Sequence, residues 1–128
     1  MKQKILIVGI LLIAGLILAS PASAATLVDK NTHTIYSSKF NSYGTMTYNT
    51  YKISTTHYRT YIYVKYRNGK DGKLQMDLTK PSYSKIKIVT VQRTDWGNAT
   101  HTNYISTSWS VYKFYFSYWK YVLRSTTS

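Results

Sequence analysis

Residues 57–79 read HYRTYIYVKYRNGKDGKLQMDLT, and they contain the clearest structural signal in the chain. From 57 to 67, two sets of side chains alternate with the period of a β-strand. One set is mainly apolar: Tyr58, Thr60, Ile62, Val64 and Tyr66. The other is basic and aromatic: Arg59, Tyr61, Tyr63, Lys65 and Arg67. Residues 68–72 contain Asn-Gly and Asp-Gly, which suit tight turns, and residues 73–79 alternate again. The stretch therefore predicts a β-hairpin.

The flanking sequence predicts further strands. Short strands are expected at 26–28 and 34–36, joined by a turn at 29–31, and another strand at 44–53. Pro81 lacks an amide hydrogen and should interrupt pairing. Residues 83–94 read as a strand whose apolar parity changes near Ile88 and Val89. Either a β-bulge or burial on both faces explains that change.

The last predicted element spans residues 105–123. Trp109, Tyr112, Phe116, Trp119 and Leu123 are spaced as on one face of a helix. The density of aromatic residues nevertheless favours one long bent strand or two strands. We therefore predict an all-β fold, a single antiparallel β-sandwich or open barrel of about seven strands. The segment from 109 to 121 is read as core, with insertion into a membrane as the alternative.

The first 24 residues have the layout of a secretory signal peptide. Lys2 and Lys4 precede a fifteen-residue apolar run (5–19), which is followed by small residues ending in Ala22-Ser23-Ala24. A span of the bilayer needs roughly 20 residues, so we expect cleavage after Ala24, with a retained membrane anchor as the alternative. The expected location is secreted or cell-surface, and residues 25–128 would form one β domain. The chain has no cysteine, which leaves no site for a lipid-modified cysteine or a disulfide.

The predicted mature domain is strongly basic. It holds 15 of the 17 Lys and Arg residues against four Asp and no Glu, a formal charge of +11. All 20 aromatic residues, 14 of them Tyr, also lie in it. Such a charge attracts polyanions and anionic surfaces, although it also simply keeps a tyrosine-rich protein soluble.

Catalytic chemistry has little support. The acidic residues are Asp29, Asp71, Asp77 and Asp95, of which Asp71 and Asp95 lie in predicted turns. His33, His57 and His101 are scattered without metal-ligand spacing, and no nucleophile motif is present. We expect no enzymatic activity, no cofactor and no metal; a zinc site assembled from the three histidines is the weaker alternative.

The basic and aromatic set of the hairpin is the candidate binding face. Arg59, Tyr61, Tyr63, Lys65 and Arg67 would project from one side of a strand about 6.6–6.8 Å apart. We expect Lys73 to lie near Arg67, and Lys85 and Lys87 to extend the face from a neighbouring strand. Guanidinium groups bind phosphate or carboxylate, and tyrosine rings stack on sugars or cations. An ordinary solvated sheet face is the competing interpretation. Separately, Asn98-Ala99-Thr100 is an acceptor sequon for N-glycosylation.

These features predict a non-enzymatic secreted or surface domain that binds an anionic polymer, a glycan or an envelope surface. A membrane surface is a further candidate partner, whereas we do not expect a nucleic-acid partner because no RNA-binding motif is present. The small basic chain with its aromatic stretch at 114–119 resembles secreted bacteriocins of the lactococcin type in composition. That resemblance implies an alternative function, an effector that acts on membranes or cell walls. A structural envelope component is the third possibility.

Overall fold

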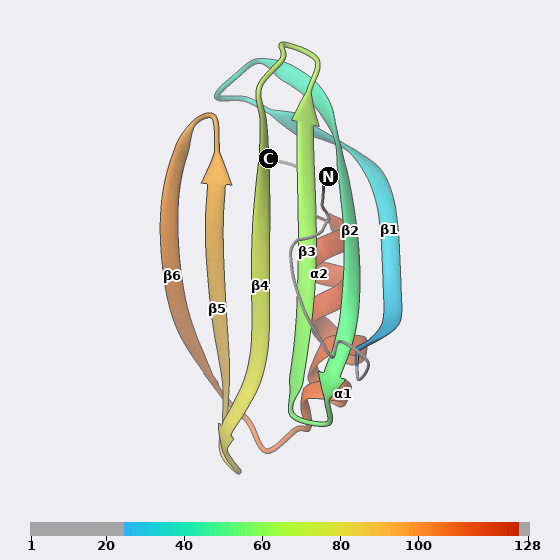
Figure 1. The fold of residues 1–128 in the computed structure, drawn as a ribbon, viewed down its shortest axis with the longest axis vertical. Helices are drawn as coiled ribbons and strands as arrows, with labels where there is room; N and C mark the ends of the chain where they lie inside the picture. The colour runs from blue at the N-terminus through green and yellow to red at the C-terminus, as the bar shows by residue number, and fades with distance from the viewer. Residues whose placement is uncertain (1–24, 126–128) are drawn as a thin grey trace.

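The computed structural model of the protein describes residues 25–125, so the predicted signal peptide lies outside the described residues. Six strands form one antiparallel sheet in chain order. They are β1 (Thr26–Ser37), β2 (Ser42–Ser54), β3 (His57–Tyr66), β4 (Asp71–Ser82), β5 (Lys85–Thr94) and β6 (Gly97–Ser106). One helical segment follows and lies behind β2 and β3 in the view of Figure 1. The expected all-β antiparallel architecture is therefore confirmed in its main part, as an open sheet with a helix instead of two packed sheets.

The predicted hairpin is confirmed as β3 and β4. Residues of the mainly apolar set are all buried on β3, and Gly69 adopts a positive φ of 92° in the turn. Gly72 does not share that role, because it lies in β4, where an added Cβ would come within 2.3 Å of the Thr94 side chain. Pairing of β4 with β5 shifts between Thr79 and Ser82, as expected from Pro81.

The prediction for the first strands was wrong, whereas for β5 one of the two explanations, burial on both faces, is confirmed. Residues 26–37 form one strand without a turn at 29–31, and a bulge at Val28 shifts the register instead. On β5 the pairing is continuous from Lys85 to Thr94 against β6, without a bulge at Ile88 and Val89. The apolar residues of β5 occupy both faces: Ile86 and Ile88 are buried on one, and Val89 is half-buried on the other.

The last predicted strand is a helix. After the unpredicted strand β6, residues 111–125 form α1 (Val111–Phe114), a π-helical turn η3 (Tyr115–Trp119) and α2 (Lys120–Ser125). Ser110 caps the first turn, since its hydroxyl accepts a hydrogen bond from the Lys113 amide at 3.0 Å. The strand propensity of the aromatic residues is overridden because a helix can bury one stripe of them against the sheet.

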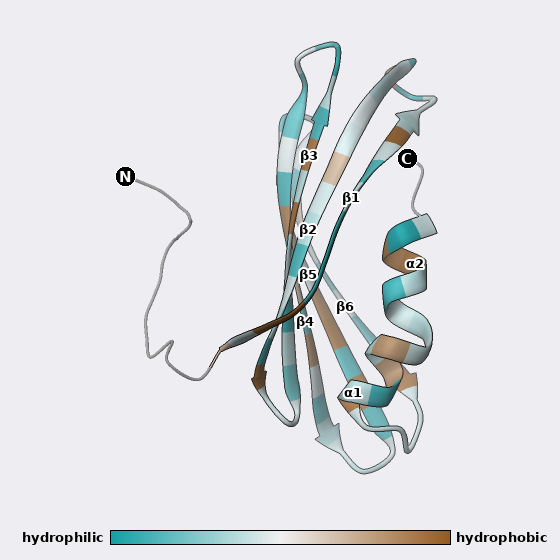
Figure 2. Ribbon diagram, turned by 90° about the vertical axis from the view of Figure 1, so that its right-hand side faces the viewer, coloured by the Kyte–Doolittle hydropathy of each residue, from teal (hydrophilic) through white to brown (hydrophobic). Residues whose placement is uncertain are grey.

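The core lies between this helical segment and the sheet face that it covers, which we call the inner face. Val111, Phe114, Tyr115 and Leu123 of the helix are each at most 3% exposed. They pack on buried residues of the central strands, among them Tyr48, Tyr58, Leu78 and Ile86. Figure 2 shows the helix on one side of the sheet and, among residues 25–125, no helix or strand on the other.

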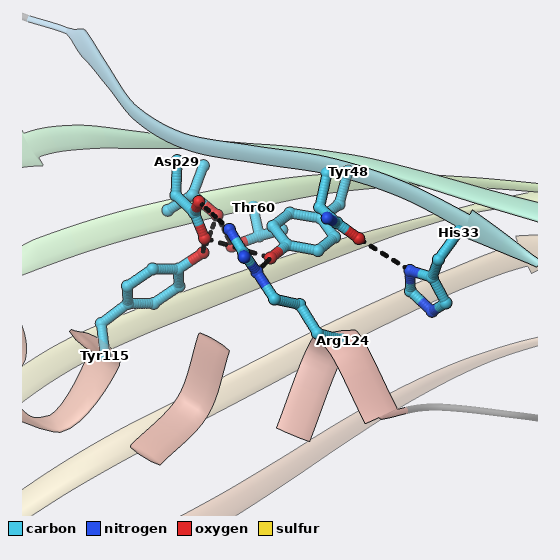
Figure 3. A network of polar contacts seen from close by, with 8 residues as sticks. Asp29, His33, Tyr48, Thr60, Tyr115 and Arg124 are labelled. Atoms are coloured by element: carbon cyan, nitrogen blue, oxygen red, sulfur yellow. Dashed lines mark hydrogen bonds and ion pairs between the residues drawn. The ribbon is translucent and has the colours of Figure 1, made fainter. Parts of the chain in front are cut away.

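A polar network anchors the helix to the inner face (Figure 3). Asp29, carried inward beside the β1 bulge, accepts hydrogen bonds from the Tyr115 hydroxyl at 2.8 Å and from Arg124 at 2.7 Å. Arg124 also donates to the Tyr48 hydroxyl at 2.9 Å. The buried Thr50 hydroxyl lies 2.6 Å from that of Tyr115.

The network links the helical segment to the sheet and has a structural role. The Asp29 side chain is only 9% exposed, whereas that of Arg124 is 39% exposed. Burial raises the pKa of Tyr115 well above its ordinary value, and the hydrogen bond to the Asp29 carboxylate adds to the rise. The phenol is therefore a neutral donor that ties η3 to β1 and β2.

We predict that Gly69→Val lowers the free energy of unfolding by about 1–3 kcal/mol, because a branched residue is strained at positive φ. Gly69→Asn should lose less, since asparagine tolerates the left-handed region. Equilibrium denaturation measures both variants. Equal stability of Gly69→Val and the unmodified protein would contradict the assigned turn.

We also predict that Asp29→Asn and Arg124→Gln each destabilise the fold by about 1–3 kcal/mol. Because the two side chains share one network, the double variant should lose less than the sum, with a coupling energy of about 0.5–3 kcal/mol. Denaturation of all four proteins tests this, with Lys30→Gln on the opposite sheet face as a near-neutral control. Strict additivity would show that the pair does not act as a unit.

Candidate binding face

The sheet face that carries no helix, here called the helix-free face, contains the predicted binding residues. Arg59, Tyr61, Tyr63 and Lys65 project from it because the alternate residues of β3 are buried on the inner face. The strand register places three of the predicted lysines on the same face: Lys73 on β4, and Lys85 and Lys87 on β5. The sheet thus brings seven of the eight predicted residues onto one surface.

Two details of the predicted arrangement were wrong. Lys73 lies opposite Tyr63, not next to Arg67. Arg67 follows the end of β3, where its amide donates to the Tyr43 carbonyl at 2.8 Å. Its guanidinium lies 5.8 Å from the centre of the Tyr43 ring. Arg67 therefore stands at the turn end of the face, beside β2.

Tyrosine rings form a large part of the helix-free face. Tyr61 and Tyr63 are 38% and 39% exposed, and Tyr104 on β6 is 56% exposed. Tyr61 packs edge-on against Tyr51 with ring centres 6.0 Å apart. Such contacts hold the rings upright on the sheet while they leave ring surface open to solvent.

Asp77 interrupts the positive ladder. Its Oδ1 accepts hydrogen bonds from Arg59 Nε at 2.7 Å and His57 Nε2 at 2.6 Å, and its Oδ2 accepts one from Gln75 at 3.0 Å. Burial alone would raise the pKa of Asp77, but these hydrogen bonds and the Arg59 charge outweigh burial and lower the pKa below its ordinary value. Arg59 is therefore neutralised on the face.

Lysine and arginine side chains without a carboxylate partner surround the Asp77 cluster on this face. On the central strands of the helix-free face, the cationic side chains that form no ion pair within residues 25–125 include Lys65, Lys73, Lys85, Lys87 and Arg93. Asp71, at the turn end of β4, accepts a hydrogen bond from the Tyr63 hydroxyl at 3.3 Å. The free cations of β4 and β5 thus lie beside the exposed rings of β3 and β6.

The three histidines are not brought together. His33 lies on β1 and bonds Asn31, His57 lies on β3 with Asp77, and His101 is on β6, at the far side of the sheet. Within the described part of the chain, no three His, Cys, Asp or Glu side chains are grouped to hold a metal ion. His57 and Asp77 form a histidine–carboxylate pair, but no serine or threonine hydroxyl within residues 25–125 is hydrogen-bonded to His57.

Two further sequence features have a place in the fold. Asn98 is exposed at the start of β6 and pairs with Arg93 on β5, so the sequon is on the surface. The aromatic segment is divided: Phe114 and Tyr115 are buried, while Tyr112, Tyr118 and Tyr121 are at least half exposed. No helix within residues 25–125 is long and apolar enough to cross a membrane.

Sequence reasoning missed the pairing of Arg59 with Asp77 and the inward position of Asp29. The first follows from the hairpin register, which places residues 59 and 77 opposite each other. The second had a weaker signal, an isolated acidic residue among strand-forming residues. Comparison with known proteins adds nothing to either site, since no protein-family model, curated protein or solved structure matches the chain.

We predict that Asp77→Asn lowers the free energy of unfolding near pH 7 by about 1–2 kcal/mol, because a half-buried charged acceptor is lost. A carboxyl whose folded pKa is lowered stabilises the fold above its unfolded pKa of about 3.9. The gap between the two proteins should therefore close as the pH falls below about 4.

Denaturation curves between neutral and acidic pH measure that gap. Asp71→Asn, which removes the same charge from the turn end of the same strand without breaking an ion pair, is the matched control. A gap that stays constant into acid would show that the Asp77 charge does not stabilise the sheet.

Proposed function

We propose that the protein is a non-enzymatic binding domain that recognises an anionic polymer or glycan through its helix-free face. The observation that carries the proposal is the combination on one open face of exposed tyrosines with lysines that have no carboxylate partner. The formal charge of +11 on residues 25–128 would draw such a partner from a distance. Secretion or display at the cell surface, proposed from the leader, would give access to such polymers.

The geometry of the face favours an extended partner. Adjacent strands lie about 4.8 Å apart and alternate side chains about 6.6–6.8 Å apart, so charges and rings form a regular grid. Lysines of β4 and β5 would contact sulfate, phosphate or carboxylate groups, while Tyr61 and Tyr63 would stack on sugar rings. The Asp77 cluster would divide the grid and leave the free charge toward β5.

The alternative function, an effector that acts on membranes or cell walls, is supported by a different surface. The outward side of the C-terminal helix exposes Tyr112, Tyr118 and Tyr121. Lys113 lies over the Trp109 ring at 4.9 Å, and Lys120 lies between the rings of Phe116 and Tyr121. Aromatic rings with adjacent lysines suit the interface of an anionic membrane.

We predict that replacing Lys65, Lys73 and Lys87 by Gln weakens binding to immobilised heparin about tenfold or more, since each lysine near an anionic surface is worth about 1 kcal/mol. The control triple, Lys52→Gln, Lys113→Gln and Lys120→Gln, removes equal charge away from the face and should weaken binding much less. Binding of the unmodified protein should fall steeply as salt rises from about 0.1 to about 1 M.

Tyr61→Ala and Tyr63→Ala together separate the two partner classes. A glycan would stack its sugar rings on these tyrosines, so heparin binding should fall in the double variant. A bare polyanion such as polyphosphate binds through charge, so polyphosphate binding should persist. Circular dichroism first establishes that each variant is folded. Equal losses from the two lysine triples would leave only diffuse attraction, and leakage from phosphatidylglycerol vesicles would favour the effector function.

A further inference from the structure

An apolar cleft of about 600 Å³ opens between the inner face and the end of the helix. It lies toward the β1–β2 and β5–β6 turns, where Phe40 and Trp96 contribute to its walls. Part of the inner face is left uncovered there because α2 ends well before the strands do (Figure 2). The volume falls within the roughly 300–1,000 Å³ typical of sites for small ligands.

The walls of the cleft are mainly apolar, with Ser37, Ser38, Gln92 and Thr94 as polar residues among them. The sheet contributes Ile35, Val64, Leu74 and Met76, and the helix contributes Val122. Leu74 and Met76 are only half-buried, although they pack against the core cluster. The helix thus leaves part of the apolar inner face uncovered, and apolar surface of this kind favours a hydrocarbon chain.

One end of the cleft is aromatic and positively charged. Phe40 packs edge-on against Tyr66 and Trp96, with ring centres 5.4 and 5.2 Å apart. Two ammonium groups flank the Phe40 ring, Lys39 at 5.7 Å and Lys70 at 5.6 Å from its centre. Neither lysine forms an ion pair within residues 25–125. Lys39 lines the cleft, and Lys70 lies against the Phe40 ring that forms part of its wall. A mainly apolar cleft with these cations at one end is complementary to an amphiphile with an anionic head.

We propose that this cleft binds a long-chain fatty acid, with the hydrocarbon chain along the inner face and the carboxylate beside Lys39 and Lys70. The cleft is on the side of the sheet opposite the helix-free face. The proposal is therefore independent of polymer or glycan binding by that face.

The test uses cis-parinaric acid, a polyene fatty acid that fluoresces in apolar sites, and its methyl ester as the uncharged counterpart. The acid should bind saturably and about tenfold more tightly than the ester, and the difference should shrink in high salt because screening weakens the ionic contact. Trp96 and Trp119 line the cleft, so binding should also change the tryptophan emission.

Variants locate the site. Met76→Trp, or the smaller change Leu74→Phe, fills the cleft and should weaken binding of both probes about tenfold. Val91→Trp makes a comparable change on the helix-free face and should have little effect. The pair Lys39→Glu and Lys70→Glu should weaken the acid about tenfold and leave the ester within about twofold. Lys52→Glu and Lys113→Glu provide the matched change in charge and should spare both probes.

Three results would overturn the proposal. They are the absence of saturable binding of the acid to the unmodified protein, equal affinities for acid and ester, and binding that survives both cleft-filling variants in folded protein. Failure here is distinguishable from failure of the proposed function. The Lys65, Lys73 and Lys87 substitutions should weaken polyanion binding about tenfold or more without changing the fatty-acid affinity.

Discussion

An open antiparallel sheet with one apolar face is stable only when something covers that face, and here a single helical segment does so. The requirement is strict because the inner face carries large side chains such as Tyr48 and Tyr58, which are at most 1% exposed. Apolar packing supplies most of the attraction, while the Asp29 network determines where the helix lies. The Asp29 carboxylate accepts hydrogen bonds from two parts of the helical segment, Tyr115 in η3 and Arg124 in α2.

The two candidate surfaces follow from this one-sided cover. Since the helix packs on the inner face only, no helix or strand of residues 25–125 covers the other face, and many of the outward-facing polar and aromatic residues are exposed. Because the helix is shorter than the strands, it also leaves an apolar cleft at one end of the inner face. The proposed polar and apolar binding sites therefore lie on opposite sides of the same sheet.

Most of the positive charge of the described chain has no ion-pair partner. The described chain has only four carboxylate side chains, and two of them, Asp29 and Asp77, form the ion pairs with Arg124 and Arg59. The two arginines are neutralised as structural partners, whereas the thirteen other Lys and Arg residues of the described chain form no ion pair. Lysine, a mobile and strongly hydrated cation, therefore dominates the positive surface on both sides of the molecule.

The sequence by itself determined the strand periodicity, the hairpin and the face on which each residue of β3 lies, because alternation with a period of two is a local property of the chain. It did not determine register. The hairpin is centred at residue 68 and pairs Lys65 with Asp71, so Lys73 lies opposite Tyr63 instead of near Arg67. The same register places Arg59 opposite Asp77. Only the tertiary structure decided that residues 111–125 are a helix and that Asp29 points inward. Both outcomes depend on covering an apolar sheet face, a contact between segments distant in sequence that no local pattern records.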